Sequence, residues 1–271
     1  MQHSELLAVA QSAANAAVEV HQRYAGRVTL DQWSNKGSAD FVSHVDHEAE
    51  ARIAETILAA FPHHRIMAEE EVSSSGRGMG EPWRESDWLW IVDPLDGTTN
   101  FLHGYPMYAV SIAVLHRGEL QAGIVACGPT GEVWSASAGG GARLNGQPIQ
   151  VSRIETLRPA LIGTGFPFKN LDLMPGYLRQ FDTVMRNTAG VRRAGSAALD
   201  LCHVASGYFD GFWELDLYPW DIAAGTLIVR EAGGVVTSLI GELDLFERTG
   251  VLAGNPRIHQ QLGRLLQELE S

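Results

Sequence analysis

An apolar run that ends in a sharp acidic turn constrains this chain more than any other feature. Trp88 to Val92 is apolar throughout and predicts a buried strand, which leaves Asp93 at its carboxyl end, where sheet proteins place their chemistry. Pro94 cannot extend a strand ladder and Asp96-Gly97 is a strong turn pair, so we expect the chain to reverse here. Both carboxylates should then face the same space.

The residues that follow this turn are suited to hold an anion. Thr98, Thr99 and Asn100 fit the first turn of a short helix, whose N–H groups would point at an anion bound there. The two convergent carboxylates add hard oxygen ligands for metal ions beside the same anion. This stretch of a dozen residues therefore predicts a phosphate site.

The charge of the whole chain limits what such a site can bind unaided. Its 271 residues, 45% hydrophobic and 19% charged, form an ordinary globular composition with room for one large domain or two intimate ones. The net charge of −12 opposes binding to nucleic acid or to an anionic membrane, so we expect neither as a partner. It equally opposes an anionic substrate, because the 20 Lys and Arg are scattered. A phosphate ester would need divalent cations.

The sequence also predicts a cytoplasmic protein. No apolar run approaches the 18 residues of a membrane span, and no basic segment precedes an apolar stretch at the N-terminus. Cys127 and Cys202 lie far apart without Cys-x-x-Cys spacing, which is typical of free thiols in a reducing compartment.

Hydrophobic periodicity predicts an α/β chain with two mixed layers, the first more antiparallel than the second. Helices are expected over 4–25, 45–61, 173–187, 197–206, 221–232 and 256–269. Strands are expected over 65–68, 88–92, 109–115, 120–126, 131–137, 161–164, 209–214, 235–238 and 250–253. A loop or short edge strand is expected over 36–43, and a mobile loop over 73–80. The change of pattern near 151–158 divides the chain into parts 1–152 and 153–271.

Several acids near these elements have both a structural and a functional interpretation. Asp46 forms a capping-box pattern with Ser43, or it belongs to the active site. The triplet Glu69-Glu70-Glu71 is a solvated turn, or it meets Asp93 at one edge of a sheet. Asp221 is the N-cap of a helix, or it lines a crevice with Glu214.

Two separated signatures resemble those of the inositol monophosphatase family, in the family's order. They are Asp93-Pro94-Leu95-Asp96-Gly97-Thr98-Thr99-Asn100-Phe101, preceded by Glu69-Glu70, and Trp220-Asp221-Ile222-Ala223-Ala224-Gly225 with Glu231-Ala232-Gly233-Gly234. The likeness also touches Lys36, Asp40, Asp46 and Gly195-Ser196-Ala197, so it covers nearly the whole chain. It implies a layered αβαβα sandwich and a magnesium-dependent, lithium-sensitive phosphatase that converts inositol monophosphate to inositol and phosphate. It also implies a homodimer.

The resemblance further assigns ligands for two to three magnesium ions. The first ion would be held by Glu69, Asp93 and the carbonyl of Leu95, and the second by Asp93, Asp96 and Asp221. A third, weaker ion would lie near Glu69 through waters. Magnesium prefers octahedral oxygen ligands, and two ions ~3.5–4 Å apart can clamp both oxygens of an in-line displacement. No protein nucleophile is then needed.

The remaining implied roles concern the water and the substrate. Thr98, paired with Asp46, would orient the attacking water together with Glu69. The phosphate would rest on the N–H groups of Gly97 and Thr98. The alcohol portion of the substrate would contact a set of three residues, Glu214, Ala197 and Asp96.

Three residues depart from the family pattern and leave the substrate open. Ala68 precedes the Glu pair where the family often has Gly or another small residue, and Glu71 makes the ligand register ambiguous by one residue. Asp216 adds an acid between Glu214 and Asp221 where relatives commonly have a small residue. The same metal residues would also serve an enzyme of sugar bisphosphate, histidinol phosphate or phosphoadenosine phosphate.

Two other classes of protein compete with this interpretation. A haloacid-dehalogenase-type phosphatase would form an aspartyl-phosphate, but its two acids are separated by one residue, whereas two residues separate Asp93 from Asp96. A phospho-enzyme trapped on either acid would favour it. The third class is an interaction protein with a secondary phosphatase activity, which a partner captured independently of Asp93 would support.

Overall fold

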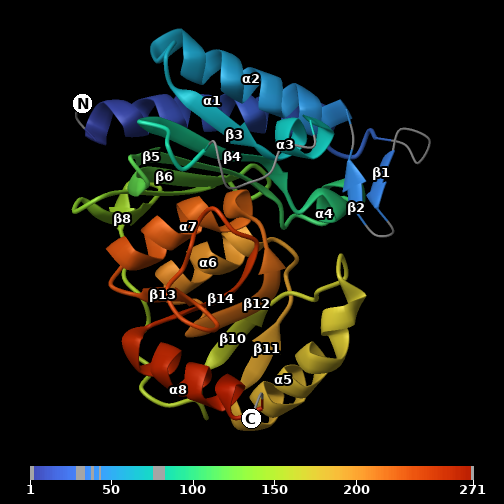
Figure 1. Cartoon of the computed structure of the whole chain (residues 1–271), viewed down its shortest axis with the longest axis vertical. Coiled ribbons are helices and arrows are strands. Elements are labelled where there is room, and N and C mark those ends of the chain that lie inside the picture. The colour runs from blue at the N-terminus through green and yellow to red at the C-terminus, as the bar shows by residue number, and fades with distance from the viewer. Residues whose placement is uncertain (1–2, 29–33, 38–39, 43, 76–82, 270–271) are drawn as a thin grey trace.

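The helices and strands of the chain stack in alternating layers (Figure 1). The computed structural model describes residues 3–28, 34–37, 40–42, 44–75 and 83–269. From one outer face to the other, the layers are helices α1 (His3–Tyr24) and α2 (His44–Ala60), a seven-stranded sheet, helices α6 (Ala197–Ala205) and α7 (Pro219–Glu231), a five-stranded sheet, and helices α5 (Met174–Asn187) and α8 (Pro256–Gln267). The predicted αβαβα sandwich is confirmed.

The seven-stranded sheet carries the central motif. Its strands, in spatial order, are β3 (Arg65–Ala68), β4 (Trp88–Asp96), β5 (Ala109–His116), β6 (Glu119–Cys127), β7 (Glu132–Ser137), β8 (Gly141–Leu144) and β9 (Gln147–Pro148). Among the described residues of this sheet, only β3 and β4 pair in parallel, and Ala68 lies opposite Val92. Glu69 directly follows β3 and Asp93 lies at the same level within β4, so the two acids meet at one edge of the sheet as predicted, although β4 does not end there.

The five-stranded sheet supplies the opposite side of the site. Its strands, in spatial order, are β11 (Gly190–Arg192), β10 (Leu161–Thr164), β12 (Gly211–Leu217), β14 (Thr249–Gly254) and β13 (Val235–Ser238). Strand β11 has no counterpart in the sequence prediction. The prediction that a strand ends at Glu214 is wrong, because β12 continues past a bulge between Glu214 and Leu217.

Strand β4 is apolar without alternation because both of its faces are covered. Trp90 and Val92 pack into the core beneath α1 and α2, whereas Leu89 and Ile91 pack into the core that contains α6 and α7. A strand with two buried faces loses the polar residues that alternation would place on a solvated face. A third core lies beneath α5 and α8.

The shorter elements refine the sequence predictions near the site. They are β1 (Ser34–Gly37), β2 (Asp40–Val42), α3 (Glu69–Ser75), α4 (Thr98–Leu102) and a 3-10 turn (Leu171–Leu173). The prediction of a loop from residue 73 is wrong, because α3 continues to Ser75; residues 76–80 of that loop, and Ser43, lie outside the described residues. Strand β4 does not stop at Val92 but runs through a bulge to Asp96.

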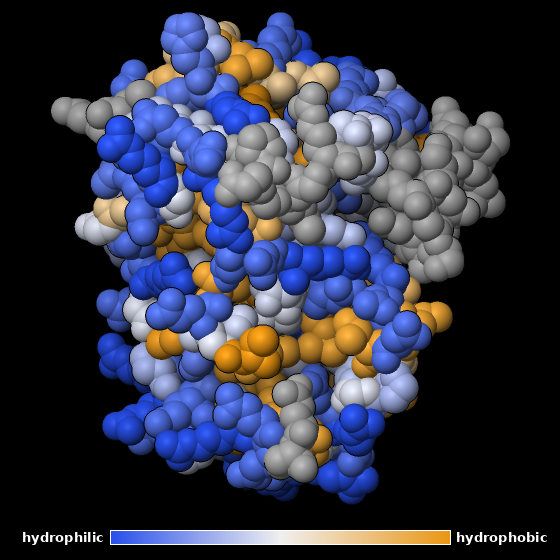
Figure 2. Space-filling model, in the orientation of Figure 1, coloured by the Kyte–Doolittle hydropathy of each residue, from blue (hydrophilic) through white to orange (hydrophobic). Residues whose placement is uncertain are grey.

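The face of the molecule seen in Figure 2 is largely hydrophilic. On the face seen in Figure 2, hydrophobic residues gather in a band across the middle of the molecule. Among the described residues, no helix is both long and apolar enough to cross a membrane. The boundary near residue 152 lies between β9 and β10, and a division into two domains there stays a prediction.

Candidate metal and phosphate site

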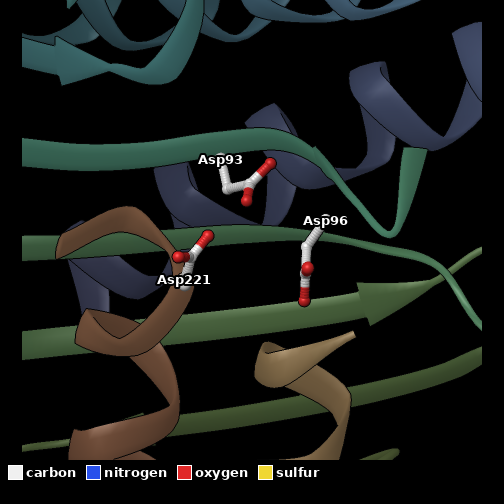
Figure 3. A group of neighbouring side chains, drawn as sticks. All are labelled: Asp93, Asp96 and Asp221. Atoms are coloured by element: carbon white, nitrogen blue, oxygen red, sulfur yellow. The ribbon is translucent and has the colours of Figure 1, made fainter. Parts of the chain in front are cut away.

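The bulge in β4 brings Asp93 and Asp96 to the same side of the sheet. In a regular strand, residues three apart point to opposite faces. Here Asp93 pairs with Ser111 and Asp96 pairs with Ala109, so β4 has one residue more than β5 across this interval. The extra residue turns the second acid to the side of the first. Figure 3 shows both carboxylates directed into one space.

A third carboxylate reaches this space from α7. One oxygen each from Asp93, Asp96 and Asp221 lies within 4.8 Å of the others, and Figure 3 shows Asp221 rising from the first turn of its helix. Asp221 is the third residue of α7 rather than its N-cap, which is Tyr218. Its Oδ2 accepts a hydrogen bond of 2.7 Å from the Tyr218 N–H. Asp221 therefore combines a capping contact with a place in the cluster.

The other two acids are also held by one oxygen each. The Leu95 N–H donates to Asp93 Oδ1 at 2.9 Å. Asp96 Oδ2 accepts from the Ser196 hydroxyl at 2.6 Å and from the Ala198 N–H at 2.8 Å. Within the described part of the chain, no protein donor meets the second oxygen of either acid. These contacts fix both carboxylates and leave an oxygen of each directed at the cluster.

The charges of this cluster fit a divalent cation. Burial raises the pKa of Asp93 well above its usual range, and repulsion from Glu69, Asp96 and Asp221 raises it further. Burial likewise raises the pKa of Asp96 to about 6 and that of Asp221 to about 7. Enclosed like charges are costly unless a counter-charge joins them. An all-oxygen donor set of this kind matches the preference of magnesium and similar hard cations.

Glu69 is the acid of the triplet that faces the site. It begins α3 and lines the same pocket as the three aspartates, whereas Glu70 is buried and Glu71 is exposed. The carboxylate of Glu50, from α2, accepts hydrogen bonds from the N–H groups of Glu70 at 2.8 Å and Glu71 at 3.0 Å. The triplet therefore starts a held helix and is not a solvated turn.

Asp46 reaches the site through Thr98. The Thr98 Oγ1 atom lies 3.1 Å from Asp46 Oδ1 and 3.0 Å from the carbonyl oxygen of Leu95. Asp46 is buried in the first turn of α2, and its proposed capping partner Ser43 lies outside the described residues. The contact favours the active-site interpretation of this acid.

Gly97 allows the chain to enter α4 directly after the acids. Its φ of 90° is in the left-handed region, and a Cβ atom there would lie 2.9 Å from the Met107 carbonyl oxygen. Both the conformation and the space therefore require glycine. The Asn100 amide donates to the carbonyl oxygens of Met107 at 2.6 Å and Ala194 at 2.9 Å, which ties α4 to the segment before α6.

All of these groups meet at one cavity of about 350 Å³. The residues singled out from the sequence line it, apart from Asp46, which lies behind Thr98: they are Glu69, Asp93, Leu95, Asp96, Gly97, Thr98, Ala197, Glu214 and Asp221. Glu214 packs so closely on Gly165 that a Cβ atom on that glycine would lie 1.9 Å from Glu214 Oε1. The structure thus brings the candidates together, while their roles stay predictions.

The sequence analysis missed the outer wall of this cavity. Phe166, Phe168, Lys169 and Arg193 also line it. The Arg193 guanidinium carbon lies 5.4 Å from the ring centre of Phe166 and 5.6 Å from that of Phe168. The signal in the sequence that could have found this wall is the run Phe166 to Lys169, which contains a proline and a cation and follows a predicted strand.

Asp216 lies at a second bulge, in β12. Its φ of 68° is left-handed, and the pairing of β12 with β14 shifts between Glu214 and Leu217. Arg248 holds the carboxylate through Nε at 2.6 Å from Oδ1 and Nη2 at 2.6 Å from Oδ2. The additional acid flagged by the sequence is therefore paired at the rim of the cavity.

The chain is similar to known proteins along nearly its whole length. The model of the inositol monophosphatase family matches residues 2–271. A Neisseria meningitidis serogroup B protein named Putative Nus factor SuhB is 45% identical over 260 residues, 96% of this chain and 97% of that protein. The Inositol-1-monophosphatase of Rhizobium meliloti is 42% identical over 269 residues, 98% of each chain. The crystal structure of extragenic suppressor protein suhB from Bartonella henselae superposes with a TM-score of 0.89 at 40% identity, covering 97% of this chain and 98% of that chain.

Proposed function

The chain belongs to the inositol monophosphatase family, a metal-dependent phosphatase type, and on that premise we propose that it hydrolyses an inositol monophosphate to inositol and inorganic phosphate. The observation that carries the proposal is the convergence of oxygens from Asp93, Asp96 and Asp221 within 4.8 Å at a cavity with Glu214 on its wall. The printed name of the Rhizobium meliloti relative supports this choice of substrate.

Magnesium is the cofactor that we propose, with two to three ions in the site. Glu69, Asp93 and the Leu95 carbonyl would hold one ion, and Asp93, Asp96 and Asp221 would hold another, because these oxygens share one cavity. When bound, the ions would neutralise the phosphoryl charge and activate a water. Lithium sensitivity is part of the proposal and would show as inhibition that rises with lithium concentration.

Thr98 would orient the attacking water. A hydroxyl has one proton, and Thr98 directs its own at Asp46 Oδ1, 3.1 Å away, or at the Leu95 carbonyl, 3.0 Å away. Donation to Asp46 leaves the Leu95 carbonyl for the cofactor and the Thr98 lone pairs for a water proton. Glu69, on the adjacent strand end, would accept the second proton of that water.

The substrate would bind between α4 and the wall of the cavity. We assign the phosphate to the N–H groups of Gly97 and Thr98, where glycine lets the backbone approach closely. We assign the alcohol portion to Asp96, Ala197 and Glu214. Burial and the charge of Asp221 raise the pKa of Glu214 to about 8. Its carboxyl group offers two oxygens to the hydroxyls of a polyol.

A substrate panel tests the proposal. Phosphate release is measured with inositol 1-phosphate, fructose 1,6-bisphosphate, histidinol phosphate and 3′-phosphoadenosine 5′-phosphate, each with and without magnesium. We expect magnesium-dependent preference for inositol 1-phosphate. Preference for another ester would contradict the substrate and keep the metal chemistry, whereas silence on all four esters would contradict the enzyme.

A second copy of the chain is the protein partner that we propose. The 3-10 turn and α5 expose Leu171, Leu178 and Met185 at 64%, 54% and 49% of their surfaces, and these residues recur every seventh position. A large apolar stripe of this kind favours association over solvation. Light scattering should give the mass of a dimer for the natural chain and of a monomer for Leu178→Glu. A monomeric natural chain would contradict the dimer.

The names of several relatives support a second candidate function. The Neisseria relative is named Putative Nus factor SuhB, and a Pseudomonas aeruginosa relative is named Nus factor SuhB at 42% identity. As a second candidate function, we propose that the chain acts as an interaction protein in the role that this name denotes. Capture of a stoichiometric partner by the natural chain and equally by Asp93→Asn would support it, and dependence of capture on Asp93 would contradict it.

The cytoplasm is the compartment that we propose. Cys127 and Cys202 are both buried and free. Free, buried thiols are typical of proteins that remain in a reducing compartment.

A further inference from the structure

The bulge that carries the metal ligands leaves a backbone carbonyl that strand pairing cannot satisfy. Pro94 and Leu95 lie between the paired residues Asp93 and Asp96. The Leu95 N–H donates to Asp93 Oδ1, and the Leu95 carbonyl lies 3.0 Å from the Thr98 hydroxyl. Pro94 has no N–H, so its only polar backbone group is its carbonyl. A buried carbonyl without a donor is costly, and this one therefore needs a partner from elsewhere.

That partner is His21, from the last turn of α1 in the outer layer. The ring of His21, on α1, is 0% exposed, and its Nε2 atom lies 2.9 Å from the Pro94 carbonyl oxygen. A carbonyl only accepts, so Nε2 carries the proton. The ring is flanked by Phe101 and Tyr108, with ring centres 6.0 and 5.9 Å away. A donor on one helix is thus held against the turn that carries the acids.

The placement of His21 is not explained by packing alone. Its Nδ1 atom is buried and has no partner among the described residues, which disfavours an imidazole relative to an apolar ring. Burial also lowers the pKa of the imidazole to about 4, so the ring is neutral and keeps a single donor. Phenylalanine would fill the same space without an unsatisfied atom. What histidine supplies is the hydrogen bond to Pro94.

We propose that His21 is a positioning residue for the metal site: its Nε2–H fixes the Pro94 peptide, so that the Asp93 and Asp96 carboxylates converge with the Leu95 carbonyl between them. The inference rests on the proposed function for the identity of the cation. It assigns a role to the outer helical layer of α1 and α2, which covers the face of the seven-stranded sheet opposite to α6 and α7 (Figure 1). Hydrogen bonds that orient the surroundings of metal ligands commonly influence the affinity of the site for the metal.

Two substitutions separate the hydrogen bond from the packing. His21→Phe keeps a ring and removes the donor, whereas His21→Gln keeps an N–H donor of similar reach. Magnesium binding to the metal-free protein is measured by calorimetry. We expect His21→Phe to weaken binding about tenfold or more and His21→Gln to stay within about threefold of the natural chain. The magnesium concentration for half-maximal phosphate release should rise in His21→Phe, with most of the rate recovered at saturating magnesium.

His203 offers a matched control. It is also a histidine with an unpartnered, buried Nδ1, and its ring packs edge-on against Trp134 at 5.9 Å, away from the metal ligands. His203→Phe should leave magnesium affinity unchanged. Natural affinity in His21→Phe would overturn the proposal, and so would an equal loss in His21→Phe and His21→Gln, or in His203→Phe.

A measurement on the natural chain keeps the test independent of variants that fail to fold. The nitrogen chemical shifts of the His21 ring should report a neutral imidazole protonated at Nε2, and the Nδ1–H tautomer would overturn the proposal. The test is also separate from the proposed substrate. Weakened magnesium binding in His21→Phe, together with no phosphate release from inositol 1-phosphate by the natural chain, would leave His21 in its role and remove the substrate.

Discussion

Two β-bulges border the active cavity, and they are built differently. The first, in β4, turns Asp96 to the side of Asp93. The second, in β12, lies between Glu214 and Leu217. Bulges are frequent beside active sites because one extra residue re-aims a side chain. Each bulge here follows an acid that lines the cavity, yet the first lies in the interior and the second at the rim.

The polar groups of the two bulges are satisfied in different ways. In the first, hydrogen bonds from Leu95 and His21 hold the Asp93 carboxylate and the Pro94 carbonyl in the interior. In the second, Asp216 has a left-handed backbone and its carboxylate is paired with the partly exposed Arg248. We call the bulge in β4 the sealed bulge, because hydrogen bonds from His21 and Leu95 enclose it, and we propose that it holds the metal ligands. We call the bulge in β12 the open bulge, because it lies at the rim of the cavity, and we propose that it influences the choice of substrate.

The largest expected effect comes from removing a charge at the sealed bulge. Asp93→Asn keeps an oxygen that accepts from the Leu95 N–H but loses the negative charge shared by the metal ligands. We expect the rate of phosphate release to fall roughly a thousandfold or more, at every magnesium concentration. Asp210→Asn is the matched control, because Asp210 is a buried acid that accepts from the Leu161 N–H at 2.7 Å, outside the cavity. Full activity in Asp93→Asn would contradict the proposal that the bulge in β4 holds the metal ligands.

Acid should destabilise the support of the sealed bulge. Burial lowers the pKa of His21 in the folded protein to about 4, below the ordinary histidine value of 6.5, so the folded state resists protonation. The contribution to stability is fully present above pH 6.5 and is lost as pH falls toward 4, by about 3 kcal/mol. Urea unfolding of the natural chain and of His21→Gln across this range isolates it, because glutamine does not titrate. If the unfolding free energies of the two proteins changed with pH in parallel, the prediction would be refuted.

The wall beside the open bulge should control substrate affinity more than catalysis. In Gly165→Ala the new Cβ atom would lie 1.9 Å from Glu214 Oε1, so the carboxylate must move. We expect the KM for inositol 1-phosphate to rise about tenfold, with magnesium affinity unchanged. Gly176→Ala is the control, because the nearest atom to its Cβ is Arg179 Nη2 at 3.9 Å. A changed magnesium affinity in Gly165→Ala would contradict the proposal that one bulge serves metal binding and the other serves substrate choice.

The smallest effect is expected within the open bulge itself. Asp216→Gly relieves a left-handed conformation but removes the pair with Arg248, and the two changes offset each other to within about 1 kcal/mol. Stability from urea unfolding should change little, while the ranking of substrates in a panel should shift. A loss of turnover as large as that of Asp93→Asn would place this bulge in the metal machinery.

Local sequence patterns predicted most of the fold because most of its elements depend on neighbouring residues. The apolar run before Asp93 requires a strand covered on both faces, and the turn residues after it allow only a short helix. The same local signals predicted that Glu69 and Asp93 meet at one edge of the sheet, although Asp93 lies within β4 and not at its end. Family-like spacing then singled out Asp221 and Glu214, which the structure brings to the same cavity.

Contacts between distant segments could not be predicted in this way. A bulge depends on the register with a neighbouring strand, so the sequence predicted that strands end at Val92 and Glu214 when both continue. The start of α3 at Glu69 depends on Glu50, which holds its first turn from another helix. His21 is 73 positions from Pro94, and no local pattern relates the two.

The most direct test of the central claim is to locate the cations. Crystals of the natural chain soaked in manganese, a stand-in for magnesium with an anomalous signal, are measured for an anomalous difference map. We expect strong peaks among the carboxylates of Asp93, Asp96 and Asp221, with Glu69 beside them. A map without a peak there, from crystals that bind manganese elsewhere, would contradict the claim that the sealed bulge is the metal site.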